Sequence, residues 1–265
     1  MSSAAPLLVR PLRLAGPGDH RLVSGLLGSA PGWSRARAPD GGISFTSPCR
    51  TAAITGSGPP DHSWAWTVHG YPAPGSRPLW RAAFGPGTPA EITAAFTAVL
   101  VDGLRSGHRD YLRGGPHHLP GTPASVLADR GWQPAPGPKG FHDQVAPDAT
   151  ARYRHRVGHQ PTDAEVAGLA PPSWTMLAGD PKHPSWRADF TIGVPFYPLL
   201  RATLAFSSVE PVERPLGAIP ARHLPHVTAR RAPTAQPARR PYACPPPGPA
   251  APAAAVPAPG GARRR

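Results

Sequence analysis

A Trp-Arg-Ala pattern that occurs twice limits what this chain can fold into. Residues 79–104 read LWRAAFGPGTPAEITAAFTAVLVDGL, and residues 185–209 read SWRADFTIGVPFYPLLRATLAFSSV. Six positions coincide at the start of the two segments: Trp80/Trp186, Arg81/Arg187, Ala82/Ala188, Phe84/Phe190, Gly87/Gly193 and Pro89/Pro195. Each segment is typical of a strand, a Gly/Pro turn and an amphipathic helix. The repetition predicts an internal duplication and therefore two similar structural units.

Further matches precede the repeated strand at a smaller offset. Gly131-Trp132 repeats Gly32-Trp33, and Pro147 repeats Pro48, both at an offset of 99 residues (132 − 33 and 147 − 48). At the Trp-Arg-Ala strand the offset is 106 (186 − 80), so the second copy carries a net insertion of seven residues (106 − 99). We expect this insertion at 158–172, which is rich in Pro and Gly.

Short strand patterns precede the helix of the first copy, at residues 43–46, 51–55, 64–69 and 79–84. Connections this short favour antiparallel pairing, because parallel neighbours need a long crossover. Alternation on the strands and the apolar stripe of the helix predict that the helix covers one face of the sheet. The residues predicted for this core and its second copy are Trp64, Trp66, Trp80, Phe84, Ile92, Phe96, Trp186 and Phe190.

The start of the helix carries its own signature. Thr88 is expected at the N-cap, Pro89 at the first helical position and Glu91 at the third, which together form a capping box. In the second copy Pro195 to Pro198 replaces this pattern, and 141–145 is a poor strand.

The sequence predicts an α+β fold of two tandem α-ββββ-α modules, each a small antiparallel sheet covered by helices on one face. A Pro/Ala/Arg-rich C-terminal segment cannot build a core and is expected to be a disordered tail. The predicted boundaries are a loose lead-in at 1–18, a first module at 19–107, a linker at 108–121, a second module at 122–228 and the basic tail at 229–265.

Arginine dominates the charge of the chain. Of 28 basic residues only Lys139 and Lys182 are lysine, and the formal net charge is +13. Seven arginines and no acid lie in 229–265, which leaves +6 (13 − 7) for residues 1–228. A basic tail attracts polyanions without specificity. A very GC-rich genome also produces a bias toward Arg, Ala, Pro and Gly, so the charge alone does not indicate a nucleic-acid role.

The cysteines and the hydropathy pattern predict a cytoplasmic protein. Cys49 and Cys244 are far apart, and the spacing indicates neither a disulfide scaffold nor a thiolate metal site. The N-terminal apolar run is too short for a signal peptide. No window approaches the roughly 18–20 apolar residues of a membrane span, so no membrane partner is expected.

No motif of a known catalytic or cofactor site is present. The sequence lacks a phosphate-binding Gly-x-x-x-x-Gly-Lys, a Gly-x-Ser-x-Gly elbow and a His-Glu-x-x-His helix. The twelve histidines have no Cys, Asp or Glu at ligand spacing, and loop histidines exposed to solvent explain them better than a metal site. We therefore expect a protein that is not an enzyme and has no cofactor or metal.

A run of arginines is the candidate binding site. At the 99-residue offset Tyr153 falls on Ile54 and points to the core, so Arg152, Arg154 and Arg156 are expected to line the open face of the sheet. Alternation places Arg187 on the same face. These guanidinium groups could bind a polyanion. The alternative is an ordinary solvated face in an arginine-rich chain.

The order of these elements also supports a resemblance to a known family. Residues 87–97, GTPAEITAAFT, are its most specific part, and Gly-Trp, Ser-Pro and Trp-x-Trp precede them in order. The chain resembles the tandem-repeat domain of unknown function (family 317) that is widespread in streptomycetes and their relatives. The resemblance covers roughly residues 12–228 in two copies. It implies no activity and no catalytic residues.

Two function classes remain open from the sequence. The first is a binding module for nucleic acid, weakly specific, salt-dependent and directed to single strands, which uses the basic open face. The second is a module for protein–protein interaction or self-assembly through the open sheet faces. The direction in which the three arginines of 151–156 point is expected to discriminate between them.

Overall fold

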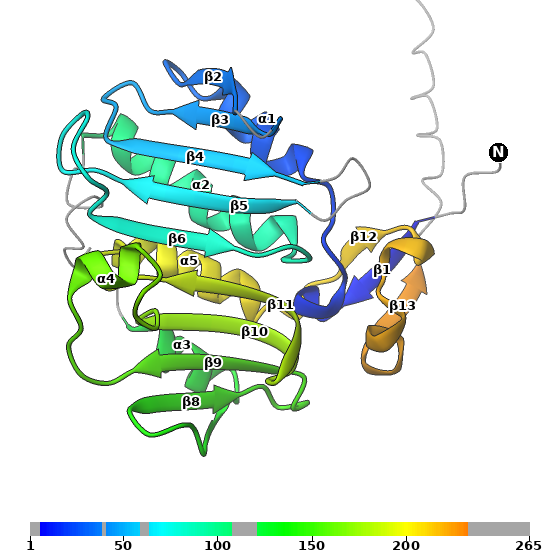
Figure 1. Ribbon diagram of the computed structural model, residues 1–265. Coiled ribbons are helices and arrows are strands. Elements are labelled where there is room, and N and C mark those ends of the chain that lie inside the picture. The colour runs from blue at the N-terminus through cyan, green and yellow to red at the C-terminus, as the bar shows by residue number, and fades with distance from the viewer. Residues whose placement is uncertain (1–5, 39–40, 59–63, 108–120, 233–265) are drawn as a thin grey trace, which may run out of the picture. The chain divides into compact units, whose positions relative to one another are not determined.

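A ten-stranded antiparallel sheet forms the centre of the structure (Figure 1). The computed structural model describes residues 6–38, 41–58, 64–107 and 121–232. In spatial order the strands are β2 (Ser34–Arg37), β3 (Ile43–Thr46), β4 (Ala52–Ser57), β5 (Ala65–Gly70), β6 (Trp80–Phe84), β11 (His183–Phe190), β10 (Trp174–Asp180), β9 (Ala151–Arg156), β8 (Phe141–Val145) and β7 (Gln133–Ala135).

The single sheet replaces the two separate small sheets that the sequence predicted. Strand β6 pairs with β11, so strands β2 to β6 and strands β7 to β11 join into one sheet. Pairing removes two exposed strand edges, which otherwise present unpaired backbone groups. Each half also contains a fifth strand, β2 or β7. Both are short and mostly exposed, and neither shows the alternation by which strands are recognised.

The contacts on the two sides of the β6–β11 junction are equivalent. Gly85 N donates to Arg187 O at 2.8 Å, and Thr191 N donates to Arg81 O at 3.0 Å. The two donors are 106 residues apart (191 − 85), and so are the two acceptors (187 − 81), so the two bonds occupy equivalent positions. A β-carbon on Gly193 would lie 3.0 Å from Leu79 O. Close approach of the two backbones therefore explains a glycine at the junction.

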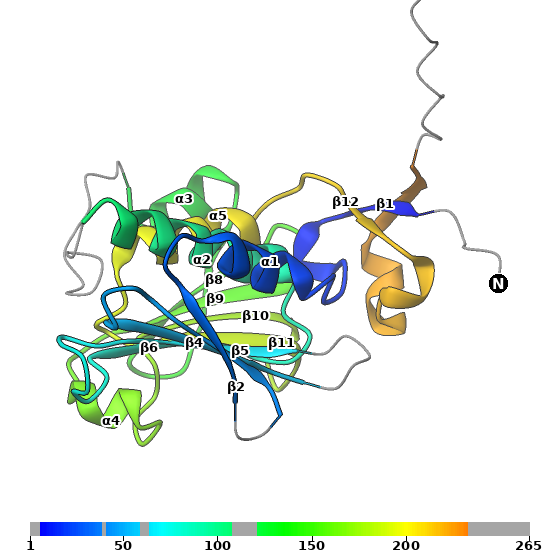
Figure 2. The ribbon, with the colours of Figure 1, turned by 90° about the horizontal axis from the view of Figure 1, so that it is seen from above.

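Four helices cover one face of the sheet (Figure 2). They are α1 (Arg21–Ser29), α2 (Ala90–Arg105), α3 (Pro123–Asp129) and α5 (Phe196–Phe206). Helices α2 and α5 pack against each other above the junction of the two halves. Their shared core contains Phe84, Phe96 and Phe190, whose ring centroids lie 5.5 to 5.9 Å apart. The halves therefore do not have separate cores.

Most of the residues predicted for the core lie in it. Trp66, Trp80, Phe84, Ile92, Phe96, Trp186 and Phe190 are buried. Trp64 is only half-buried, and its ring stacks on His20 with a centroid distance of 4.5 Å. Trp64 lies just before β5, so the alternation that assigned it to the core does not apply to it.

The predicted capping box is wrong. Helix α2 begins at Ala90 with Pro89 as its N-cap, and no side chain caps it. The Thr88 hydroxyl instead donates to Gly85 O at 2.7 Å. The Glu91 carboxylate accepts from Arg214 Nη2 at 2.7 Å. Glu91, which the local sequence pattern assigned to the helix cap, thus binds Arg214, more than one hundred residues away.

Both ends of the described chain are more ordered than the sequence predicted. β1 (Leu7–Arg10) pairs with β12 (Val212–Arg214) and β13 (Thr228–Arg231), and the short helices η1 (Leu12–Leu14), η3 (Leu216–Ala218) and η4 (Ala221–His226) accompany them. The expected lead-in at 1–18 therefore contains a strand and buried residues at 12–15. Residues 229–231 of the expected tail belong to β13. The rest of that tail from 233, and the linker at 108–120, lie outside the described residues.

Candidate binding surface

The sheet face opposite α1, α2, α3 and α5, here the open face, carries the residues that the sequence singled out. Figure 1 looks onto this face, and α4 (Thr162–Val166) lies in front of it. On β3 to β6 every second side chain points to it, and all of them are half-buried. This first-half open face consists of Ser44, Ala53, Thr55, Thr67, His69, Arg81 and Ala83.

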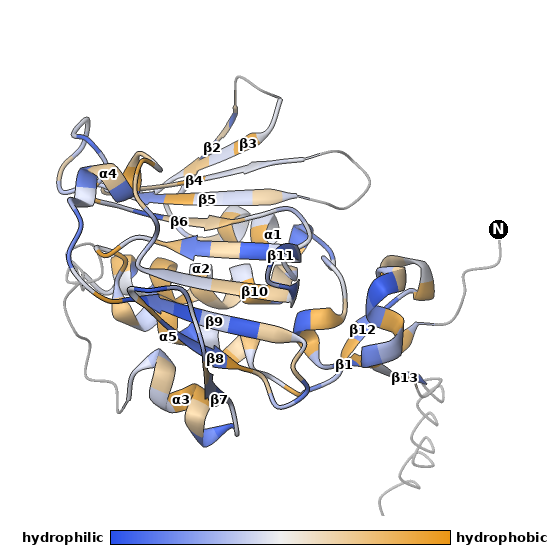
Figure 3. Ribbon diagram, turned by 60° about the horizontal axis from the view of Figure 1, so that its bottom comes forward, coloured by the Kyte–Doolittle hydropathy of each residue, from blue (hydrophilic) through white to orange (hydrophobic). Residues whose placement is uncertain are grey.

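The second half has a different set of side chains at the matching positions. The second-half open face consists of Phe141, Asp143, Val145, Arg152, Arg154, Arg156, Thr175, Leu177, Arg187 and Asp189. Coloured by hydropathy, β9 and β11 show prominent hydrophilic residues, whereas β4 and β6 are mostly pale (Figure 3). Charge on the open face is therefore concentrated in its second half.

A buried carboxylate holds two of the predicted arginines. Asp143 has a fully buried side chain and accepts from Arg152 Nη1 at 2.7 Å and from Arg154 Nε and Nη2 at 2.9 Å. Burial alone would raise the pKa of Asp143, but hydrogen bonds from Arg154 and Arg152 outweigh it and hold the pKa below its usual value. The Arg154 guanidinium also lies 5.3 Å from the centre of the Phe141 ring. Both arginines are thus fixed in place.

Arg156 lies on the predicted face but is not available to a ligand there. It is buried and forms an ion pair with Glu165 of α4. Glu165 also accepts from Ser173 Oγ at 3.0 Å and from Ile192 N at 2.9 Å. The segment that carries α4 falls in 158–172, where the sequence analysis expected the insertion. This segment covers Arg156, which corrects the prediction of an exposed site.

The fourth predicted arginine is also paired. Arg187 Nε donates to both carboxylate oxygens of Asp189, at 2.8 and 2.9 Å, and Thr175 donates to the same carboxylate. The four arginines share their face with three carboxylates, those of Asp143, Glu165 and Asp189, so their net charge is +1 (4 − 3). The predicted set lies on one face, but it is not a free cationic surface.

Arg81 has no carboxylate partner among the described residues. It is half-buried on β6 and lies beside His69 in the register of β5 and β6. Burial lowers the pKa of His69, and the charge of Arg81 lowers it further. At pH 7 this corner of the first-half open face therefore carries one positive charge.

Sequence reasoning missed the three carboxylates. Asp143 lies directly opposite Arg154 in the register of β8 and β9, so accepting 141–145 as a strand would have located the pair. Glu165 lies in 158–172, where the sequence predicted an insertion and therefore offered no earlier segment for comparison. Across the described part of the chain, no group of three or more His, Cys, Asp or Glu side chains could hold a metal ion. Nor does that part contain a helix that is long and apolar enough to cross a membrane.

Comparison with known proteins gives one partial match. Residues 46–104 match the model of the family described as SPDY, domain of unknown function (DUF317). No curated protein and no solved structure matches the chain. The matched residues contain β4, β5, β6 and nearly all of α2, which lie in the first half of the sheet and its cover.

Proposed function

We propose that the chain is a non-enzymatic binding module that docks a protein on its first-half open face. The observation that carries the proposal is the contrast between the two halves of the face. The second half pairs its four arginines with three carboxylates, one of which is Glu165 of α4, and α4 itself contacts β6. The first half presents small uncharged side chains together with His69 and with Arg81, which has no carboxylate partner in the described part of the chain. Small side chains leave room for a partner to pack closely against the sheet.

The segment around α4 indicates what such a partner would contribute. Glu165 is held by a guanidinium, a hydroxyl and a backbone N–H at the end of the sheet. Asp189 pairs with Arg187, whereas the equivalent Arg81 has no carboxylate acceptor among the residues that the structure describes. We infer that the partner presents a carboxylate to Arg81, since a half-buried guanidinium gains most from a charged acceptor.

We also infer that residues 122–228 are a second copy of the unit at 19–107. Backbone φ angles support this in addition to the identical residues. Arg50 and Ala149, 99 residues apart, both have positive φ angles, 55° and 57°. Gly32 and Gly131, at the same offset, have φ angles of 74° and 78°. The interpretation of the chain as a cytoplasmic actinobacterial protein rests on sequence features and stays a prediction.

Nucleic-acid binding is the second candidate function. It is favoured by the arrangement of Arg152 and Arg154, which share one carboxylate and so keep one net positive charge in a fixed position. Weak, salt-dependent contacts to phosphates would follow. Against it, the core-facing Trp66, Trp80 and Trp186 are buried and offer no surface on which bases could stack. Protein docking therefore ranks first.

Photo-crosslinking from the sheet face tests the first candidate. A benzoylphenylalanine at Thr67 of the full chain, produced in its native cells, is expected to give a discrete protein adduct. The same group at Leu22, which is exposed on α1, is the matched control and should give none. Arg81→Glu should abolish the Thr67 adduct, because it opposes the partner's carboxylate. Equal adducts from both positions, or adducts indifferent to Arg81→Glu, would contradict the proposal.

Fluorescence anisotropy with single-stranded and duplex DNA over a salt series tests the second candidate. The full chain is compared with an Arg152→Gln/Arg154→Gln variant and with a variant in which Arg263, Arg264 and Arg265 are glutamine. Affinity lost only in the second variant assigns binding to the tail and removes the open face as a nucleic-acid site. Affinity lost in the Arg152→Gln/Arg154→Gln variant would favour nucleic-acid binding over protein docking as the function of the open face.

A further inference from the structure

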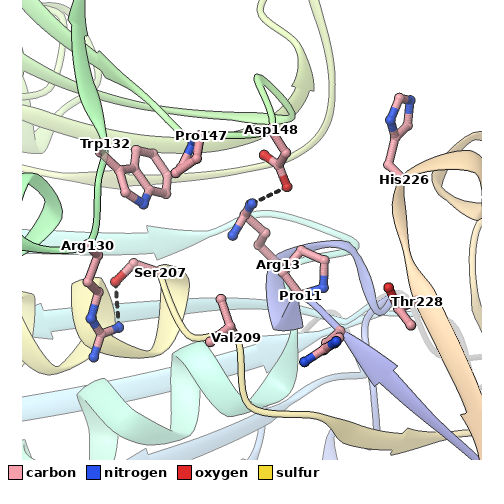
Figure 4. A pocket seen from close by; sticks show the side chains of 11 residues that line it. Pro11, Arg13, Arg130, Trp132, Pro147, Asp148, Ser207, Val209, His226 and Thr228 are labelled. Atoms are coloured by element: carbon pink, nitrogen blue, oxygen red, sulfur yellow. Dashed lines mark hydrogen bonds and ion pairs between the residues drawn. The ribbon is translucent and has the colours of Figure 1, made fainter.

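A second feature, apart from the open face, is a cavity of about 480 Å³ beside the three-stranded sheet (Figure 4). We call it the corner pocket. It lies where β1 and β13 approach the turn after β8 and the end of α5, and its charged lining consists of Arg10, Arg13, Arg130, Asp148 and His226. Its volume is in the range of small-molecule sites.

An ion pair forms one wall of the corner pocket. Arg13 is buried and pairs with Asp148, and its Nε donates to Thr150 Oγ1 at 3.3 Å. Its guanidinium lies 5.7 Å from the centre of the Trp132 ring. A buried ion pair contributes little net stability by itself. Its effect here is to fix a guanidinium beside the cavity.

The rim of the corner pocket carries further cationic side chains. Arg130 Nη1 donates to Leu204 O at 2.6 Å and to Ser207 Oγ at 2.7 Å, which anchors its guanidinium at the end of α5. Arg10 and His226 are exposed. With three arginines and one aspartate, the lining carries a net charge of +2 (3 − 1) when His226 is neutral.

The first half of the molecule contains a pocket at the equivalent place, of about 270 Å³, which we call the sister pocket. Offsets of 99 and 106 residues relate the linings: Pro31/Arg130, Trp33/Trp132, Pro48/Pro147, Cys49/Asp148 and Val101/Ser207. The tryptophan and the proline are the same in both. The other three positions are apolar or a thiol in the sister pocket and polar or charged in the corner pocket. The fold therefore does not require the charges.

We propose that the corner pocket binds a phosphate-bearing small molecule about as large as a nucleoside monophosphate. Its phosphate would lie between Arg10, Arg130 and His226, and its less polar body against Pro11, Pro147 and Val209. Guanidinium groups suit a phosphate because their planar N–H groups can donate in pairs to its oxygens. The N-terminal and C-terminal segments complete this pocket, and they supply no lining to the sister pocket.

Isothermal titration of the full chain with AMP, adenosine and inorganic phosphate tests the proposal. AMP is expected to bind saturably at one site, and adenosine at least roughly tenfold more weakly, since it lacks the charged group. Saturable binding of inorganic phosphate would support the phosphate subsite independently of the base. Absence of saturable binding for both AMP and phosphate would overturn the proposal, as would equal affinities for AMP and adenosine.

Two charge-matched variants separate the corner pocket from general attraction to a basic protein. Arg10→Gln should weaken AMP binding by roughly tenfold, and the side chain is exposed, so the fold should persist. Arg105→Gln removes the same charge at the sister pocket and should leave the affinity unchanged. Equal losses in the two variants would reduce the binding to non-specific attraction and overturn the assignment.

Discussion

The two halves of the open face share their strand register and differ in most of their side chains. One row crosses eight strands and reads Ser44, Thr55, Thr67 and Ala83 in the first half, then Asp189, Thr175, Arg154 and Asp143 in the second. Taken outward from the junction, Ala83 matches Asp189, Thr67 matches Thr175, Thr55 matches Arg154 and Ser44 matches Asp143. A hydroxyl surface in one half thus corresponds to an ion-pair network in the other.

The side chains on the other side of the same strands differ far less. Trp66 pairs with Phe84 as Trp174 pairs with Phe190. Close packing allows few changes of volume in a core, whereas a solvated face tolerates most of them. Packing in the core therefore fixes the arrangement of the strands, whereas the side chains of the open face are free to diverge. Function should therefore be sought where the halves differ.

Removal of Glu165 should have the largest effect on the second half. Glu165→Ala leaves the Arg156 guanidinium buried without its carboxylate, and breaking a buried pair costs about 3–5 kcal/mol. We expect the free energy of unfolding in urea to fall by about this amount, with faster amide exchange at 158–172. Asp163→Ala, at an exposed position of the same helix, should change stability by less than about 0.5 kcal/mol. Equal effects would mean that α4 is not held by Glu165.

Asp143 provides the next contrast. Asp143→Ala should cost about 2–4 kcal/mol, less than the loss of Glu165, because Arg152 and Arg154 are 22% and 24% exposed and water can solvate them. Ser44→Ala at the matching position should change stability by less than about 0.5 kcal/mol. Urea denaturation of both variants checks this. A small effect of Asp143→Ala would indicate that the arginines do not depend on their carboxylate.

A glycine distinguishes the core-facing sides of the two halves. Gly70 faces Trp80 as Ala178 faces Trp186, yet a β-carbon on Gly70 would lie 2.1 Å from Cε2 of Trp80. Trp186 is instead anchored by a bond from its Nε1 to Arg13 O at 2.8 Å. Gly70→Ala should therefore cost about 1–3 kcal/mol through overpacking.

The reverse change supplies the control. Ala178→Gly should cost only about 0.5–1 kcal/mol, mainly through backbone entropy. Thermal denaturation of both variants tests the difference between the halves. If the two substitutions cost the same, the tryptophans pack alike and the distinction drawn from Gly70 is wrong.

Burial could be predicted for residues in segments whose apolar positions recur with the period of a strand or a helix. Alternation along 79–84 and the stripe of the following helix located Trp80, Phe84 and Phe96, because burial imposes a period on the sequence. The pairing of β6 with β11 could not be derived. It depends on two strand edges that meet only in three dimensions, and no local pattern encodes an edge partner.

The candidate site shows the same division. Alternation placed Arg152, Arg154 and Arg187 on one face, but it could not show that Asp143 and Asp189 form ion pairs with them. Ion pairs across strands depend on register, and a shift of one residue reverses the face of every side chain. The capping box failed for a related reason, since Glu91 binds the distant Arg214. Tertiary contacts overrode local preferences at each of these positions.

The smallest expected effect concerns His69, whose matching residue is Leu177. Burial and the neighbouring Arg81 lower the pKa of His69 below the usual 6.5. The unfolded chain therefore takes up the proton first as the pH falls through about 6.5, and His69 destabilises the folded state below that pH. His69→Leu removes this contribution.

Urea denaturation of the wild type and His69→Leu between about pH 7.5 and 5.5 measures that contribution. The stability advantage of the variant should grow as the pH falls. The pKa values of His155 and His223 are also lowered, chiefly by burial, but both histidines are present in the two proteins, so their effects cancel in the difference. A pH-independent difference would show that His69 titrates as it does in the unfolded chain. The first-half open face would then be more accessible to water at this position than its half-buried side chains indicate.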